Sequence, residues 1–79
     1  MSVEQRVKEV TARVLHVSID DVTPEKNFSE DLGAQSVQSI ELVAAFEEEF
    51  DIEMDEDEAL AVETVGSAVE FIKNYVDET

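Results

Sequence analysis

At its centre the chain reads Glu30-Asp31-Leu32-Gly33-Ala34-Gln35-Ser36-Val37 and continues as Gln38-Ser39-Ile40-Glu41-Leu42-Val43-Ala44-Ala45-Phe46-Glu47-Glu48-Glu49-Phe50. From Ser36 to Phe50 the pattern predicts an amphipathic helix, because its large apolar residues recur every fourth position. Before that helix, Gly33 predicts a turn, since glycine adopts backbone conformations closed to other residues. The stretch therefore places the Ser36 hydroxyl at the start of a helix whose solvent side is acidic.

Two further main helices are expected on either side of this segment. Ser2 and Gln5 fit a capping box, and valines then recur at spacings of four, three and four, which predicts a helix from about Val3 to about His16. Thr64 is the expected N-cap of a last helix. That helix is expected to bury one stripe: Ala68, Ile72, Tyr75 and Val76.

The connections between these helices differ in length. Residues 17–35 carry turn signals and predict a long loop, held on the core by four apolar anchors: Ile19, Val22, Phe28 and Leu32. Asp51 to Glu58 is expected to be an acidic linker, followed by one short helical turn over Ala59 to Val62. The predicted fold is all-α: a small four-helix bundle with three main helices, one short helix and a long loop between helices 1 and 2.

The charge of the chain is strongly acidic. Its 79 residues include 21 Asp and Glu against 5 Lys and Arg, a net charge of −16. No Lys or Arg lies between Lys26 and Lys73. A nucleic-acid surface needs the opposite sign, and an anionic membrane would repel this one. The charge instead favours protein partners that carry basic patches, although acidity can also serve solubility alone.

Length and composition limit the organisation of the chain. We expect a single domain over residues 1–79, because so short a chain has room for one core. We also expect a monomer. No apolar segment approaches membrane-spanning length, which favours a soluble, cytoplasmic protein without membrane insertion. With no Cys and one His, a zinc site is not expected. The acidic run from Asp51 fails as a calcium loop, because Glu56 and Val62 occupy its sixth and twelfth positions. We predict no metal site.

Two interpretations of Ser36 are open from its position alone. A serine before an amphipathic helix is most often an N-cap. It can equally be a modified residue, since a phosphodiester at a helix N-terminus would meet free N–H groups and the positive end of the macrodipole. The two interpretations are compatible.

From about Phe28 to Tyr75 the sequence resembles the acyl carrier proteins, whose pattern is E-D-L-G-A-D-S-L followed by E-L-V and E-E-x-F. The resemblance implies that Ser36 carries 4′-phosphopantetheine, attached from coenzyme A by a phosphopantetheinyl transferase. It implies a single carrier domain that presents acyl chains as thioesters to basic-patched acyl-transferring, condensing and reducing enzymes. Partner contacts would come from six residues: Val37, Ile40, Glu41, Ala44, Glu48 and Glu56. The acyl chain would lie among five: Leu42, Phe46, Ile52, Leu60 and Val62.

The sequence departs from the family pattern close to Ser36. Gln35 and Gln38 replace acidic residues, Val37 replaces Leu, and Ala44 stands where a larger apolar residue is usual. The resemblance implies a carrier for fatty-acid or related biosynthesis. These differences put service in the general fatty-acid pathway in question and leave a specialised, polyketide-type or single-pathway carrier as an open alternative.

Other functions remain open from the sequence. A peptidyl carrier would have the same arm with a different cargo, and an unmodified acidic adaptor or inhibitor would use the same helix face. An enzyme is the poorest fit, because no nucleophile–base pair, carboxylate pair or metal cluster can be recognised.

Overall fold

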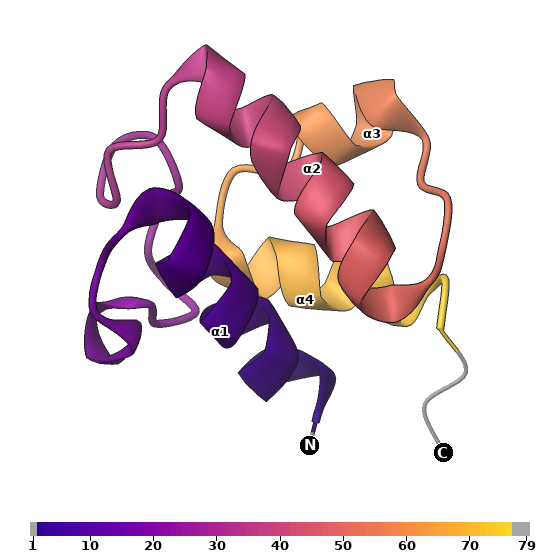
Figure 1. The fold of residues 1–79 in the computed structure, drawn as a ribbon, viewed down its shortest axis with the longest axis horizontal. Helices are drawn as coiled ribbons and strands as arrows, with labels where there is room; N and C mark the ends of the chain where they lie inside the picture. The colour runs from indigo at the N-terminus through magenta and orange to yellow at the C-terminus, as the bar shows by residue number, and fades with distance from the viewer. Residues whose placement is uncertain (1, 77–79) are drawn as a thin grey trace.

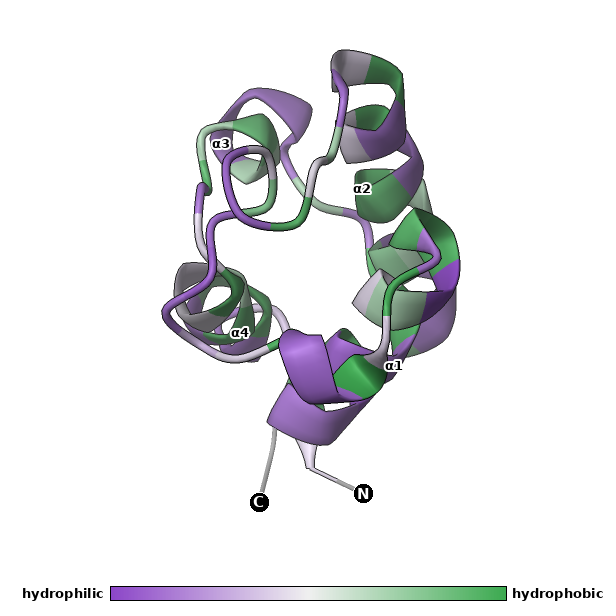
Figure 2. Ribbon diagram, turned by 90° about the vertical axis from the view of Figure 1, so that its left-hand side faces the viewer, coloured by the Kyte–Doolittle hydropathy of each residue, from purple (hydrophilic) through white to green (hydrophobic). Residues whose placement is uncertain are grey.

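The computed structural model describes residues 2–76 of the chain. Within them the elements are α1 (Val3–Leu15), the 3₁₀-helix η1 (Ile19–Asp21), α2 (Ser36–Phe50), α3 (Glu56–Leu60) and α4 (Val65–Lys73). In the end-on view α1 and α2 occupy one side of the molecule, and α3 and α4 the other (Figure 2). This confirms the predicted all-α bundle of three main helices and one short helix.

The first helix begins and ends as its sequence predicts. Ser2 is the N-cap and its hydroxyl accepts a hydrogen bond from the N–H of Gln5 at 3.1 Å. His16 follows Leu15 in the left-handed conformation and ends the helix. From this position α1 packs against both α2 and α4. Its valines supply the centre of the core, where Val7 and Val10 are almost completely buried.

The long connection between α1 and α2 lies along one side of the molecule (Figure 1). It is tied to the start of α4, where Val65 N–H donates to the Lys26 carbonyl at 3.0 Å and Gly66 N–H to that of Pro24 at 2.9 Å. These bonds satisfy N–H groups that a helix start leaves without intrahelical partners. A Cβ on Gly66 would lie 3.1 Å from the Pro24 oxygen, so glycine allows this close approach.

The loop anchors are mostly as predicted. Val22 and Phe28 are buried and Leu32 is half-buried against the core. Ile19 is 37% exposed, so its prediction as an anchor was wrong. It lies in η1, where Ser18 caps a single turn, and this turn leaves the side chain outside the core.

The short helix lies earlier in the chain than predicted. Asp55 accepts a hydrogen bond from Glu58 N–H at 3.0 Å and is the N-cap of α3, which ends at Leu60. The expected turn over 59–62 is present, since the Val62 N–H donates to the Ala59 carbonyl at 3.2 Å, but it follows a helix that begins three residues earlier, at Glu56. The acidic residues that suggested a linker occupy the first turn of α3, where the helix macrodipole favours negative charge.

The prediction for the end of the last helix also needs correction. Thr64 caps α4 as expected and accepts from Ser67 N–H at 3.2 Å. The helix ends at Lys73, so Tyr75 and Val76 lie beyond it. Tyr75 is 38% exposed rather than core, because its hydroxyl reaches the N–H of Asp55 at 3.3 Å and its ring packs edge-on against Phe71.

Candidate functional site

Ser36 is the first residue of α2, and its side chain is exposed. The N-cap is Gln35, which has an extended backbone, so capping the helix does not require the serine. Among residues 2–76 no hydrogen-bond partner is found for the Ser36 hydroxyl. The structure thus separates the two interpretations left open by the sequence: this hydroxyl is accessible and takes no part in capping.

A turn over residues 27–31, held by hydrogen bonds, precedes Ser36 in the chain. The Asn27 side-chain oxygen accepts hydrogen bonds from the backbone N–H groups of Ser29 and Glu30, each at 3.0 Å. Asp31 in turn accepts from the Asn27 N–H at 2.7 Å. These bonds fold residues 27–31 back on themselves and fix the direction in which the chain continues toward α2.

Gly33 and Ala34 then turn the chain into the helix. Gly33 has a φ of 75°, in the left-handed region that glycine adopts without strain. A Cβ there would meet no atom within 4 Å, so the conformation of the backbone, rather than lack of space, favours glycine. Ala34 is buried, and its N–H donates to the Phe28 carbonyl at 2.8 Å. Because buried Ala34 fixes the backbone two residues before Ser36, the Ser36 side chain faces solvent.

Gln35 and Gln38 are linked at the start of α2. The Gln38 side-chain oxygen accepts a hydrogen bond from the Gln35 N–H at 3.0 Å, the back-reaching half of a capping box. The two glutamines that depart from the family pattern therefore have a structural role together. They also leave the first turn of α2 without an acidic residue.

This helix start suits an anionic group on Ser36. Free N–H groups and the macrodipole of a 15-residue helix favour negative charge at its N-terminus. No carboxylate of the first turn opposes it. The hydroxyl, its exposure and its electrostatic surroundings fit the phosphodiester of a phosphopantetheine arm.

One outward face of α2 carries the residues expected to meet partners. Val37 is 66% exposed and Ile40 52%, both large fractions for aliphatic side chains. Glu41, Ala44 and Glu48 are also exposed. Glu56 is exposed in the first turn of α3.

Leu60, at the end of α3, is a further apolar residue on the surface that the sequence pattern did not indicate. Its side chain is 40% exposed.

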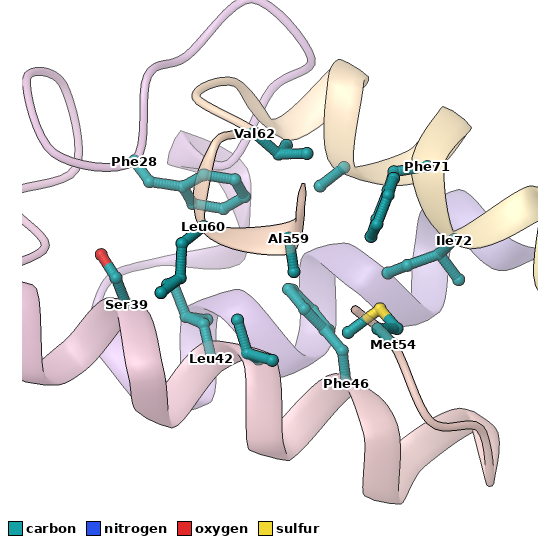
Figure 3. Close-up of a pocket in the computed structure, with 12 residues that line it drawn as sticks. Phe28, Ser39, Leu42, Phe46, Met54, Ala59, Leu60, Val62, Phe71 and Ile72 are labelled. Atoms are coloured by element: carbon teal, nitrogen blue, oxygen red, sulfur yellow. The ribbon is translucent and has the colours of Figure 1, made fainter. Parts of the chain in front are cut away.

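An apolar cavity of about 50 Å³ lies between α2, α3 and α4 (Figure 3). Four of the five residues expected to surround an acyl chain line it: Leu42, Phe46, Leu60 and Val62. Ile52 does not, and Met54 closes the end nearest the C-terminus of α2 instead. The Met54 backbone N–H donates to the Glu47 carboxylate at 2.8 Å, which directs this residue inward.

Residues 2–76 show neither a metal site nor a membrane-spanning helix. They contain no group of three or more His, Cys, Asp or Glu side chains arranged to hold a metal ion. None of their helices is long and apolar enough to cross a membrane.

Comparisons with known proteins agree with this geometry. Residues 5–72 match the family model for the phosphopantetheine attachment site. The structure is similar to a protein assigned as an acyl carrier protein from Mycobacterium tuberculosis, with a TM-score of 0.85 and 25% identity over 92% of this chain and 97% of the other. It is also similar to the acyl carrier protein of Enterococcus faecalis, with a TM-score of 0.75 and 32% identity over 96% of this chain and 100% of the other.

Proposed function

This chain belongs to the acyl carrier protein family, to which 4′-phosphopantetheine is covalently attached, and we propose that Ser36 is its attachment residue and that it carries acyl groups as thioesters. One observation above all supports the choice of residue. The Ser36 hydroxyl is exposed at the N-terminus of α2 and is not used in capping, because Gln35 holds the N-cap position.

When bound, the prosthetic group supplies the terminal thiol that holds the acyl group. The protein's own contribution is to hold the Ser36 oxygen outward and to favour the anion formed there through the start of α2. The apolar cavity beside α2 offers shelter from water to part of the cargo. On this proposal the chain is a carrier and not an enzyme.

The partners we propose are a phosphopantetheinyl transferase and enzymes that transfer, condense or reduce acyl groups. They would meet the exposed face of α2 and α3, where aliphatic side chains alternate with carboxylates: Val37, Ile40, Glu41, Ala44, Glu48 and Glu56. The net charge of −16 favours partners with basic patches. Long-range attraction would speed encounter without making the complexes tight, which suits a carrier that must leave each partner.

We further propose a monomeric, cytoplasmic carrier domain over residues 1–79, serving a specialised branch of fatty-acid or polyketide-type biosynthesis. The support lies beside Ser36. Gln35 and Gln38 make the first turn of α2 neutral, and Ala44 presents only a methyl group to a partner. A partner that recognises acids in that turn, or a large apolar side chain at position 44, would bind this surface less well.

The test is intact mass after incubation with coenzyme A and a phosphopantetheinyl transferase, using one narrow and one broad-specificity enzyme in separate reactions. We expect the wild type to gain one phosphopantetheine unit and Ser36→Ala to gain none. Ser39→Ala is the matched control, because it removes a hydroxyl one turn further along α2 and should still be modified.

The outcomes separate the proposals. Modification by the broad enzyme alone supports a specialised pathway, while equal modification by both contradicts it. No gain with either enzyme would overturn the attachment at Ser36 and favour the unmodified adaptor. In that case Gln35→Asp and Gln38→Asp would show whether the neutral first turn prevents recognition.

A further inference from the structure

The cavity beside α2 has one polar side chain in its wall. Twelve residues line it, and Ser39 alone among them has a polar group in its side chain. Ser39 lies at the end of the cavity nearest the N-terminus of α2, while Met54 lies at the opposite end (Figure 3). One end of an otherwise apolar cavity thus carries a hydroxyl.

The Ser39 hydroxyl, at the outer end of the cavity, has no hydrogen bond within residues 2–76 that would compete with a ligand. Its backbone N–H is used within the helix start, where it donates to the Gln35 carbonyl at 2.9 Å. For the side-chain hydroxyl no partner is found among residues 2–76, and the residue is half-buried. Ser67 differs in this respect, because its hydroxyl accepts a hydrogen bond from Thr64 at 2.8 Å.

Ser39 also lies next to the proposed attachment residue. Residues three apart are neighbours on a helix surface, so Ser36 and Ser39 share one side of the first turn of α2. Cargo on an arm attached to Ser36 would therefore reach the cavity at its Ser39 end. The atoms nearest the thioester would meet the hydroxyl, and the distal carbons would meet the apolar side chains.

The size of the cavity limits what it can hold. A volume of about 50 Å³ accommodates only a few heavy atoms, since a single water needs roughly 10–15 Å³ on a comparable measure. A saturated chain that filled it would strip water from Ser39 and leave the hydroxyl without a partner, which is unfavourable. An oxygen on the cargo close to the thioester would replace that water.

We propose that Ser39 is a specificity-determining residue that selects short acyl chains bearing an oxygen on C3, namely 3-hydroxyacyl or 3-oxoacyl groups, over saturated chains. The proposal rests on the carrier function and on attachment at Ser36. C3 is where condensation of two acyl groups leaves an oxygen, and ketone reduction turns that oxygen into a hydroxyl. The reactions that supply this carrier's cargo are therefore condensation and the first reduction, before the oxygen is removed.

The experiment uses the loaded protein and needs no partner enzyme beyond the transferase. Wild type, Ser39→Ala and Ser39→Thr are loaded from coenzyme A analogues that carry butanoyl or 3-hydroxybutanoyl groups through an amide, which cannot hydrolyse. Intact mass confirms complete loading. Denaturant unfolding then gives the folding equilibrium constant of each variant with each cargo, and the hydroxylated-to-saturated ratio is compared between variants.

We expect that ratio to be roughly three- to tenfold higher in wild type than in Ser39→Ala, the range set by one neutral hydrogen bond. Ser39→Thr should retain the wild-type ratio, because it keeps the hydroxyl. Methyl NMR should show the shifts of Leu42 and Leu60 responding to both cargoes.

Equal ratios in wild type and Ser39→Ala would overturn the proposal, whether Ser39 binds the carbonyl common to both cargoes or binds nothing. Loss of the ratio in Ser39→Thr would also overturn it, because a hydroxyl would then be insufficient. A wild type that is not loaded at all would be visible in the mass spectrum. That outcome would refute the carrier function itself, together with this inference.

Discussion

Asn27 and Asp31 are joined by two hydrogen bonds that run in opposite directions, one of them accepted by a side chain and the other by the backbone. The Asp31 carboxylate accepts from the Asn27 N–H at 2.7 Å, and the Asn27 carbonyl accepts from the Asp31 N–H at 2.9 Å. The pair closes the last turn of the long loop before Gly33. In the sequence Asp31 belongs to the motif that precedes Ser36, and the structure gives this acid a local role: it holds the loop, and through it the approach to α2.

The first prediction removes that acceptor. Asp31→Ala should lower the free energy of unfolding by about 1–2 kcal/mol, the range for a charge-assisted hydrogen bond near the surface. It should also slow modification of Ser36, because the turn that presents the serine is loosened. Denaturant unfolding and the time course of mass gain measure the two effects. Asp21→Ala is the control, since it removes an exposed acid of η1 in the same loop. If both variants behave alike, the effect comes from charge and not from the turn.

Much of the frame around this site could be predicted from the sequence. The bounds of α2 and its buried residues, Leu42, Phe46 and Phe50, follow from apolar spacing. The caps at Ser2 and Thr64 follow from residue type. These features depend on neighbours in the sequence, so local patterns predict them well.

The errors and omissions have two causes: contacts between distant parts of the chain, and local patterns that fit more than one structure. The apolar stripe that includes Tyr75 predicts that its side chain is buried in the core. In the structure its hydroxyl instead accepts a hydrogen bond from the backbone N–H of Asp55, which is distant in the sequence. The start of α3 at Glu56 could not be predicted from the sequence, because acidic residues suit both a linker and the first turn of a helix. The Gln35–Gln38 bond depends on a side-chain rotamer, and Ser39 became noticeable only once the cavity placed it beside apolar residues.

The second prediction concerns Arg6, which joins α1 to the end of α2. Its Nη2 donates to the Glu49 carbonyl at 2.6 Å, its Nε lies 3.0 Å from the Glu49 carboxylate, and its guanidinium lies 4.4 Å from the centre of the Phe50 ring. Arg6→Ala should lower the free energy of unfolding by about 1–2 kcal/mol, since the pair is only partly buried. Arg6→Lys should recover a fraction, because lysine keeps the charge without the planar fork.

The control for Arg6 is Lys8→Ala on the same helix. Lys8 makes one surface pair with Glu4 at 3.6 Å, so its loss should lower stability by no more than about 0.5 kcal/mol. Denaturant unfolding of the three variants gives the comparison. Equal losses for Arg6→Ala and Lys8→Ala would show that loss of positive charge, and not the contact with α2, lowers stability.

The third prediction follows from the uneven charge. With a net charge of −16, the folded chain concentrates carboxylates that repel one another. Added sodium chloride screens this repulsion, and millimolar magnesium chloride should do so at lower concentration because the ion is divalent. We expect both salts to raise the melting temperature. Melting curves that do not move with magnesium would contradict the prediction.

The fourth prediction concerns Glu25 in the long loop. The Thr23 hydroxyl donates to its carboxylate at 2.7 Å, and this bond lowers the pKa of Glu25 below its ordinary value of 4.5. A carboxyl whose folded pKa is depressed stabilises the fold above its unfolded pKa, and the contribution is lost as the pH falls through the folded pKa. Thr23→Val should raise the pKa of Glu25 in an NMR titration. Its effect on the melting temperature should be present at neutral pH and vanish well below pH 4.5.

The last prediction compares two threonines whose hydroxyls have opposite roles. Thr11 is completely buried in α1, and its hydroxyl has no hydrogen-bond partner in the part of the chain that the structure describes. A buried hydroxyl without a partner opposes folding. Thr11→Val should therefore raise the free energy of unfolding by about 1 kcal/mol, because valine keeps the shape and removes the unsatisfied group.

The same substitution at Thr64 should have the opposite effect on stability, because the Thr64 hydroxyl makes a hydrogen bond. Its hydroxyl oxygen accepts from Ser67 N–H at 3.2 Å and caps α4, so Thr64→Val should lower the free energy of unfolding by about 1 kcal/mol. Denaturant unfolding of both variants measures the two signs directly. A Thr11→Val variant that is less stable than wild type would mean that the buried hydroxyl is satisfied in solution. Since the two substitutions remove identical atoms, a difference in sign can come only from their surroundings.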